Sequence, residues 1–203
     1  MRIALTEVPL WIALLPVAAY LVAVGCLHLR RRPVALSGHV DVALLTLGIA
    51  GMVIAGPLAL LQPGAGTSVW TTAVLLLGFA VVVAGALLAA RPRMVIYNVG
   101  LDQLRPVVAS VAAGLDPTAR WAGETAALPA RGLQVHLDER GPARTVSVIA
   151  AGRTSAEAWA EFSRRLRRAI RTVRVRPSPW AWTFLGAGVA VASASAWLAL
   201  TTR

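Results

Sequence analysis

Hydrophobic residues along the chain gather into four long blocks, at residues 8–29, 42–61, 69–90 and 180–200. Each block holds between 20 and 22 residues and contains no Asp, Glu, Lys or Arg. A helix rises about 1.5 Å per residue, so a block of this length reaches about 30 Å, the thickness of the hydrocarbon core of a bilayer. The pattern therefore predicts four transmembrane helices, because core helices of a soluble protein need a polar shell that this chain lacks.

The stretch between the third and fourth blocks, residues 91–179, follows shorter periods. Residues 94–99 are apolar on both faces, which is typical of a central strand. Apolar and polar residues alternate from Leu133 and again from Val146, which is the period of half-buried strands. Residues 121–128 hold one or two further short strands. The stretch is therefore expected to contain one sheet of up to five strands.

Two helices are expected in the same stretch. The first covers 102–113, and Gly114 is placed to end it. The second begins after Thr154, which forms a capping-box pattern with Glu157. This second helix carries an apolar stripe at spacings of three and four residues: Trp159, Phe162, Leu166, Ile170 and Val173. The order strand, helix, up to four strands, helix predicts an α+β layer with both helices on one face of the sheet.

The fold class predicted from these patterns is an α-helical membrane protein of four transmembrane helices, with a small α+β domain inserted between the third and fourth. Residues 1–90 hold three of the helices, residues 91–179 form the domain with its basic juxtamembrane helix, and residues 180–203 hold the fourth helix. The fourth block also carries two lines of small residues that would let helices approach closely: Gly186, Ala190 and Ala194, then Gly188, Ala192 and Ala196.

The arginines predict the orientation. Arg30, Arg31 and Arg32 follow the first block, the connection 62–68 carries no charge, and residues 91–179 carry 15 Arg against 7 acidic residues. Arginine-rich segments beside membrane helices stay in the cytoplasm. We therefore expect a multi-pass protein of the plasma (inner) membrane with both termini outside and residues 91–179 cytoplasmic. Tryptophans lie at the expected block ends, where headgroups would be: Trp11, Trp70, Trp180, Trp182 and Trp197.

The composition excludes several classes of protein. The chain is 57% hydrophobic and 14% charged, whereas ordinary soluble domains are about 25% charged. A disordered chain and a purely soluble enzyme are therefore excluded, and a disulfide-stapled domain is excluded because Cys26 is the single cysteine. Val24-Gly25-Cys26 resembles the lipobox of bacterial lipoproteins, in which Cys26 would be acylated. The membrane helix is favoured over that alternative because Arg30–Arg32 would then have to be exported.

The positive charge lies next to the expected membrane helices. The body of the domain, residues 94–163, has 6 Arg against 7 acidic residues, so most of the net charge of +11 lies elsewhere. A nucleic-acid surface would need a basic face on the domain, and no nucleic-acid partner is expected. The expected partner is the lipid bilayer. Anionic inner-leaflet lipids are expected to contact seven arginines: Arg91, Arg93, Arg164, Arg167, Arg168, Arg171 and Arg174.

Residues that carry chemistry are few. Cys26, His28, His39 and Asp41 fall at one expected membrane depth and could meet as a metal site. Cys26 and His28 point in different directions on a helix, so ordinary interfacial residues are the favoured interpretation. The sequence has no Ser/His/Asp order typical of a catalytic triad, no glycine-rich phosphate loop and no Cys-x-x-Cys motif. No catalytic residue, cofactor or metal is therefore expected.

These observations predict a protein that is not an enzyme. We expect a scaffold, sensor or accessory subunit that presents its cytoplasmic domain at the membrane, with a membrane protein or a second copy of the chain as partner. The alternative is a subunit of a membrane enzyme or transporter whose catalytic or coupling residues lie on a partner chain. The four blocks contain no ionisable Asp, Glu, Lys or Arg, which disfavours transport by this chain alone.

Overall fold

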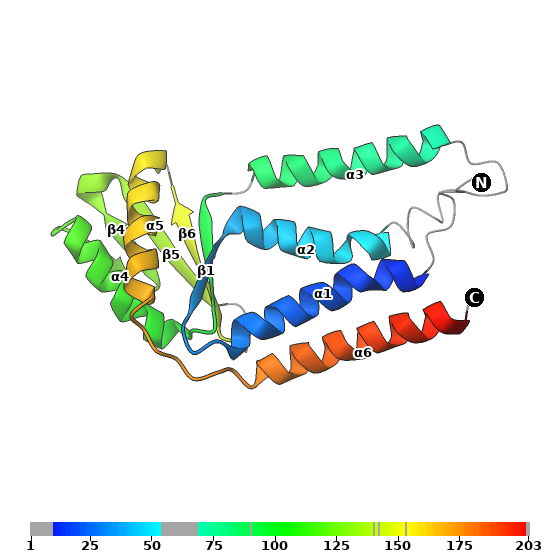
Figure 1. Cartoon of the computed structure of the whole chain (residues 1–203). Coiled ribbons are helices and arrows are strands. Elements are labelled where there is room, and N and C mark those ends of the chain that lie inside the picture. Colours follow the sequence, from blue (N-terminus) through cyan, green and yellow to red (C-terminus); the bar gives the residue numbers. More distant parts are fainter. Residues whose placement is uncertain are drawn as a thin grey trace. The chain divides into compact units, whose positions relative to one another are not determined.

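The structure, a computed structural model, describes residues 10–53, 69–89, 91–139, 141, 143–152 and 154–201. Its helices are α1 (Leu10–Leu29), α2 (Gly38–Val53), α3 (Val69–Ala89), α4 (Leu101–Leu115), α5 (Ala156–Ile170) and α6 (Trp180–Thr201), with a short 3₁₀ helix at Pro129–Arg131. Its strands are β1 (Val34–Ser37), β2 (Arg93–Tyr97), β3 (Arg120–Ala122), β4 (Thr125–Leu128), β5 (Leu133–Glu139) and β6 (Thr145–Ala151) (Figure 1).

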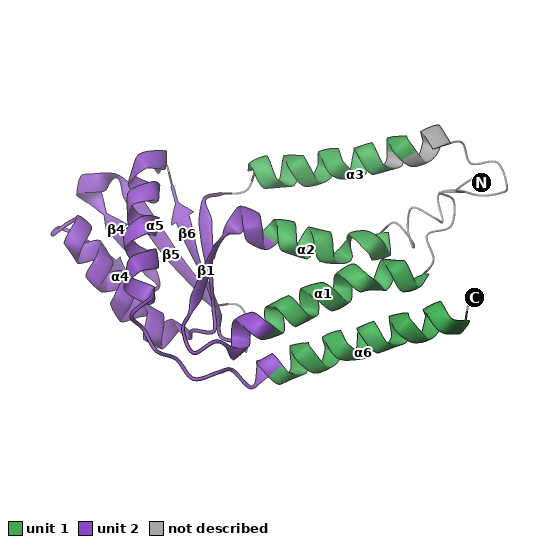
Figure 2. Cartoon of the chain, viewed as in Figure 1, with its two compact units in different colours: residues 1–25, 42–89, 182–203 green, residues 26–41, 90–181 purple. Residues whose placement is uncertain are grey.

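The chain divides into two compact units, coloured separately in Figure 2. The helical unit comprises residues 1–25, 42–89 and 182–203. The sheet unit comprises residues 26–41 and 90–181. The sheet unit therefore includes the end of α1, all of β1 and the start of α2, which lie far from the rest of that unit in the sequence.

The helical unit contains the long apolar helices. Helices α1 and α6 are long and apolar enough to cross a membrane, whereas Gly38–Val53 and the stretch Leu76–Ala89 of α3 are shorter apolar helices. The predicted second block continues to residue 61, and its last part lies outside the described residues. A mixed α+β chain with two long apolar helices is thus confirmed, and the four-span arrangement stays a prediction.

Close packing in the helical unit depends on a glycine of α6. A Cβ atom added at Gly188 would lie 2.7 Å from a methyl carbon of Val22 on α1. The Ser195 hydroxyl donates a hydrogen bond of 2.5 Å to the backbone oxygen of Trp11, which joins the same two helices seven residues further along α6. Gly186 has no atom within 4 Å of such a Cβ. Of the first glycines in the two expected lines of small residues, Gly188 lies in close contact with α1 and Gly186 does not.

The sheet unit is built on a six-stranded antiparallel sheet in the order β1-β2-β6-β5-β4-β3. The predicted order strand, helix, four strands, helix is confirmed for residues 93–170. β1 was not predicted. It comes from the connection between α1 and α2, and it pairs with β2 from Val34 opposite Tyr97 to Ser37 opposite Met94.

The core lies between one sheet face and helices α4 and α5, as predicted (Figure 1). Large buried side chains of this core come from both helices and from four strands: Met94, Ile96, Leu104, Val108, Leu128, Leu133, Leu137, Val148, Phe162 and Leu166. Three members of the predicted apolar stripe, Phe162, Leu166 and Ile170, are buried in this core. Val173 packs against the core after the end of α5.

Helix ends differ from the prediction by one to three residues. α5 ends at Ile170, whereas the predicted stripe of this helix continues to Val173. α4 continues through Gly114 to Leu115, because Leu115 is buried in the core and extends the apolar face by one position. α5 is capped by Ser155 and not by Thr154, since the Ser155 hydroxyl accepts a hydrogen bond from the Ala158 N–H at 3.0 Å. The Thr154 hydroxyl instead donates to the Ala151 backbone oxygen at 3.2 Å.

Candidate functional site

Most of the arginines that the sequence singled out are exposed on the sheet unit. Six of the seven predicted contacts are exposed: Arg91, Arg164, Arg167, Arg168, Arg171 and Arg174. Among the described residues, no carboxylate lies within ion-pair distance of these six. Arg165 differs from its neighbours on α5 because it pairs with Glu161 at 2.7 Å. The exposed six therefore carry uncompensated positive charge.

Arg93, the seventh predicted contact, is placed differently. Its side chain is 20% exposed, and its Nη2 atom lies 3.4 Å from Oδ2 of Asp41. The Tyr97 hydroxyl donates to the other oxygen of the same carboxylate. The charge of Arg93 is therefore balanced within the sheet unit, where it joins β2 to the first turn of α2.

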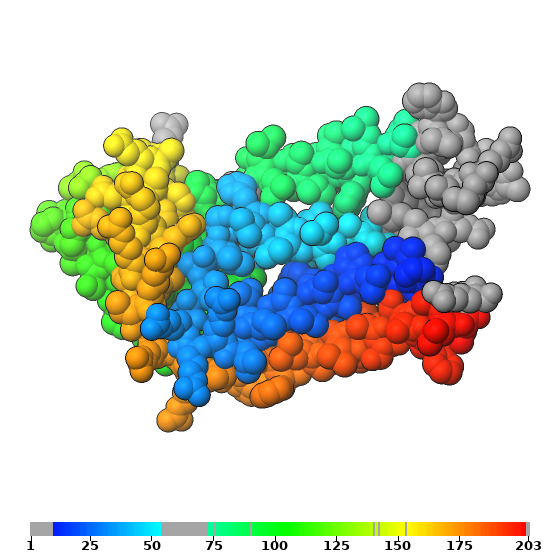
Figure 3. All heavy atoms as spheres, viewed as in Figure 1, coloured from blue at the N-terminus to red at the C-terminus, as the bar shows by residue number. Residues whose placement is uncertain are grey.

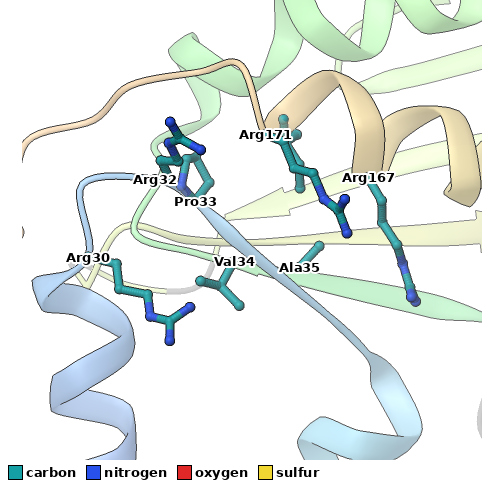
Figure 4. Close-up of a pocket in the computed structure, with 8 residues that line it drawn as sticks. Arg30, Arg32, Pro33, Val34, Ala35, Arg167 and Arg171 are labelled. Atoms are coloured by element: carbon teal, nitrogen blue, oxygen red, sulfur yellow. The ribbon is translucent and has the colours of Figure 1, made fainter.

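Two exposed arginines at the C-terminal end of α5 line a pocket together with arginines from a distant part of the sequence. Arg167 and Arg171 line a cavity of about 400 Å³ together with Arg30 and Arg32. The rest of the lining is aliphatic and comes from Pro33, Val34, Ala35 and Ile170. Figure 4 shows Val34 and Ala35 between the arginines of the two walls. We call this cavity the arginine pocket.

The wall that carries Arg30 and Arg32 is held by backbone and side-chain hydrogen bonds. The Asn98 side-chain amide donates to the backbone oxygen of Arg30 at 2.6 Å. The Val175 N–H donates to the backbone oxygen of Arg31 at 3.0 Å. Asn98 has a φ of 62°, in the left-handed region that Asn tolerates better than most residues. These bonds join the segment after α1 to the residue that follows β2 and to the segment after α5.

The end of α1 is held in the same way. The Ser178 N–H donates to the backbone oxygen of His28 at 3.0 Å. The buried His28 ring meets the Tyr97 ring edge-on, with 5.7 Å between the ring centres and 76° between the ring planes. His28 and Asp41 thus both contact Tyr97, which lies between them.

The four residues weighed as a metal site do not form one. Cys26 and His39 are exposed, while Asp41 pairs with Arg93 and accepts from Tyr97. In the described parts of the chain, no three His, Cys, Asp or Glu side chains come together in a way that could hold a metal ion. Cys26 lies inside α1, which continues to Leu29.

Two other polar residues of the sheet unit have structural partners. His136 is hydrogen-bonded through Nδ1 to the Thr125 hydroxyl at 3.0 Å, across neighbouring strands. Asp116 is buried and accepts three hydrogen bonds, from the Thr118 N–H, the Thr118 hydroxyl and the Ala130 N–H. The bond from the Thr118 hydroxyl is the main reason why the pKa of Asp116 lies below its usual value. Neither residue lines the arginine pocket.

The sequence predicts Arg167 and Arg171 as lipid contacts, whereas it predicts Arg30 and Arg32 only as a signal of membrane orientation. Arg167 lies on the arginine-rich face of α5, which the pattern of the helix reveals, and Arg171 directly follows the last residue of α5. Arg30 and Arg32 precede Pro33 and a four-residue strand, and only the pairing of that strand with β2 brings them to α5. Comparison of the chain with protein-family models, curated proteins and solved structures finds no match.

Proposed function

We propose that this chain is a multi-pass membrane protein whose sheet unit acts in the cytoplasm as a scaffold, sensor or accessory module. The observation that carries the proposal is the distribution of exposed large apolar side chains. Within the described residues, all of them lie on α1, α2, α3 and α6, and none lies between residues 91 and 179. Leu47, Val82 and Leu88 are 67%, 70% and 87% exposed, respectively. Such surfaces are stable in contact with lipid and costly in contact with water.

Helices α2 and α3 are included as spans because their surfaces resemble those of α1 and α6. Exposed apolar residues on these helices include Leu44, Leu45, Leu47, Ile49, Met52, Val74, Leu77, Val81 and Val82. The described parts of α2 and α3 carry a single charged residue, Asp41, which pairs with Arg93. Four spans would place both chain termini on the side opposite to the sheet unit, and the surrounding arginines favour the cytoplasm for the sheet unit.

The links between the sheet unit and the apolar helices support a module that stays at the membrane. β1 is followed directly by α2, and three residues, 90–92, join α3 to β2. Nine residues, 171–179, separate α5 from α6. An extended chain spans at most about 3.5 Å per residue, so links of this length keep the unit beside the bilayer. The exposed arginines Arg91, Arg164, Arg168 and Arg174 would then contact anionic headgroups.

Reporter fusions test the proposed membrane arrangement. Fusions after Gln62 and after Arg203 should be active outside the cytoplasm, and fusions after Arg32 and within residues 122–130 should be active inside it. A cytoplasmic signal at Gln62 would contradict both the number of spans and the orientation. Alkaline extraction of membranes provides an independent check, since a chain with four spans should stay with the lipid.

The alternative to a scaffold or sensor is a role in a membrane enzyme or transporter. The chain could serve as a subunit of a membrane enzyme or transporter whose catalytic or coupling residues lie on a partner chain. The absence of Asp, Glu, Lys and Arg from the four helical blocks favours this alternative over transport by the chain alone. Purification in mild detergent distinguishes the two functions. A stoichiometric partner that bears catalytic or coupling residues would support the alternative, and a chain that purifies alone or as a homo-oligomer would support the scaffold or sensor.

A further inference from the structure

We propose that the arginine pocket is a binding site for a phosphate ester. The pocket lies entirely within the sheet unit and is lined by Arg30, Arg32, Arg167 and Arg171. Its volume of about 400 Å³ falls within the range of small-molecule sites. This inference goes beyond the proposed function, because a pocket inside one unit can bind a ligand whatever the number of membrane spans.

Charge is the first argument for an anionic ligand. The four arginine residues are exposed, and among the described residues no Asp or Glu forms an ion pair with any of them. Guanidinium groups around one cavity repel each other, and the repulsion is relieved when an anion binds between them. By contrast, Arg93, Arg131 and Arg165 of the same unit all pair with carboxylates. The arginines without carboxylate partners therefore include those that line the pocket.

Fixed geometry is the second argument. The backbone that carries Arg30 and Arg32 is tied to Asn98 and to Val175 by hydrogen bonds of 2.6 Å and 3.0 Å. The opposite wall is the end of α5, which Ile170 anchors in the core. Figure 3 shows the atoms of the two walls side by side on one face of the sheet unit. Walls held in this way lose little conformational freedom when a ligand binds.

The nature of the lining indicates the class of anion. A guanidinium presents several N–H donors in a planar fork, which matches two oxygens of one phosphate group. Val34, Ala35 and Pro33 supply an aliphatic floor between the arginines. The floor suits the carbon part of an ester, and the four guanidinium groups suit a phosphate with a charge of about −2. The ester is either a lipid headgroup with a terminal phosphate or a soluble phosphate compound, and these share the chemistry that the pocket recognises.

Calorimetry on the full-length chain in neutral detergent micelles tests the site. One titration uses glycerol 3-phosphate, a soluble phosphate ester. The second uses dioctanoyl phosphatidic acid, with dioctanoyl phosphatidylcholine as the neutral-headgroup comparison. Binding should weaken about tenfold or more in R167Q/R171Q and in R30Q/R32Q, because each variant removes two charge-assisted contacts. It should also weaken as salt rises from 0.1 M to 0.5 M.

The matched control is R31Q/R176Q, which removes two exposed arginines from the same two segments without touching the lining. This control should bind like the unmodified chain. Binding of phosphatidic acid alone would identify a lipid headgroup as the ligand, and binding of glycerol 3-phosphate alone would identify a soluble phosphate ester. Where a double variant lost its fold by circular dichroism, the single variant R171Q provides the comparison.

Two outcomes would overturn the proposal. One is the absence of binding of both phosphate compounds to the unmodified chain. The other is a loss of binding in R31Q/R176Q equal to the loss in the two pocket variants. This would show that the compounds bind to a diffuse positive surface and not in the pocket. Neither result depends on the reporter fusions, so failure of the site and failure of the proposed membrane arrangement are distinguishable.

Discussion

Asp116 shows how a single buried charge is accommodated in the sheet unit. Its carboxylate has no exposed surface, and it accepts hydrogen bonds of 2.8 Å, 2.6 Å and 2.8 Å from two N–H groups and a hydroxyl. Two of these donors belong to Thr118, and the third belongs to Ala130 in the 3₁₀ helix. The side chain thus joins the end of α4 to the connection between β4 and β5.

Replacement of Asp116 by Asn should destabilise the protein. The amide offers one acceptor oxygen in place of two, so either Thr118 or Ala130 loses its partner. We expect the Tm of D116N in detergent at pH 7 to fall by roughly 5 °C. The exposed Glu124, which lies in the turn between β3 and β4, provides a control, and E124Q should melt like the unmodified chain.

The same residue predicts a dependence of stability on pH. The pKa of Asp116 is lower in the folded chain than its ordinary value, chiefly because of the Thr118 hydroxyl. A carboxyl of this kind stabilises the fold above its unfolded pKa, and this contribution is lost as the pH falls through its folded pKa. The unmodified chain should therefore lose stability on acidification below about pH 4. D116N should show a smaller decrease in Tm over the same range, and an equal decrease would contradict this role of Asp116.

At the scale of elements, the N-cap of α5 differs between the sequence pattern and the structure, and two substitutions can test which residue caps the helix. The pattern Thr154-x-x-Glu157 predicts a cap at Thr154, whereas the structure places the cap at Ser155. S155A should lower the free energy of unfolding by about 1 kcal/mol, because the Ala158 N–H loses its acceptor. T154A should cost less, since it removes one weak bond to the Ala151 oxygen. Chemical denaturation of both variants measures the difference.

The contact between α1 and α6 provides the second test at this scale. A side chain at position 188 meets Val22 and the backbone oxygen of Ala18, whereas a side chain at position 186 meets nothing. G188V should therefore destabilise the helical unit by about 1–3 kcal/mol through overpacking, and G186V should be close to neutral. Thermal denaturation in detergent with detection of aggregation measures both. Equal effects of the two variants would mean that α6 does not approach α1 at Gly188.

At the scale of the whole molecule, the sheet unit is assembled from two segments that the sequence separates. β1 covers one edge of β2, and β1 comes from the connection between α1 and α2. Without β1, the edge of β2 would expose unpaired backbone groups, which favour association between chains. The range 91–179, which the composition marks as a domain, therefore lacks one of the strands that complete the sheet.

A chimera tests this dependence. Ser37 lies opposite Met94, so residues 30–37 can be joined to residues 92–179 by a short turn to make a hairpin of β1 and β2. The chimera should be monomeric by size-exclusion chromatography and should melt roughly 5 °C above residues 91–179 expressed alone. The shorter fragment should associate. Equal solubility and equal Tm for the two would show that β1 is dispensable for the sheet.

How far the fold could be predicted depended on whether the signal was local. The alternation in β5 and the stripe of Phe162, Leu166 and Ile170 are periodic patterns that burial imposes on neighbouring residues. The four apolar blocks are continuous runs without Asp, Glu, Lys or Arg, which can be read directly from the sequence. The observed helix ends lie one to three positions from the predicted ones, because contacts in the folded chain decide that α4 ends at Leu115 and that α5 is capped by Ser155. β1 was missed because four residues with intermediate burial carry too short a pattern to identify a strand.

The sequence by itself determined the apolar helices, the α+β character of residues 93–170 and the arginine-rich face of α5. Each follows from residues close together in the chain, whose spacing decides which side chains share a face. Only the tertiary structure decided that Arg93 pairs with Asp41 and that Arg30 and Arg32 line a pocket with Arg167 and Arg171. More than 130 positions separate the two halves of that pocket in the sequence. The two halves of the pocket meet because β1 pairs with β2. In addition, Asn98 and Val175 donate hydrogen bonds to the backbone oxygens of Arg30 and Arg31, respectively.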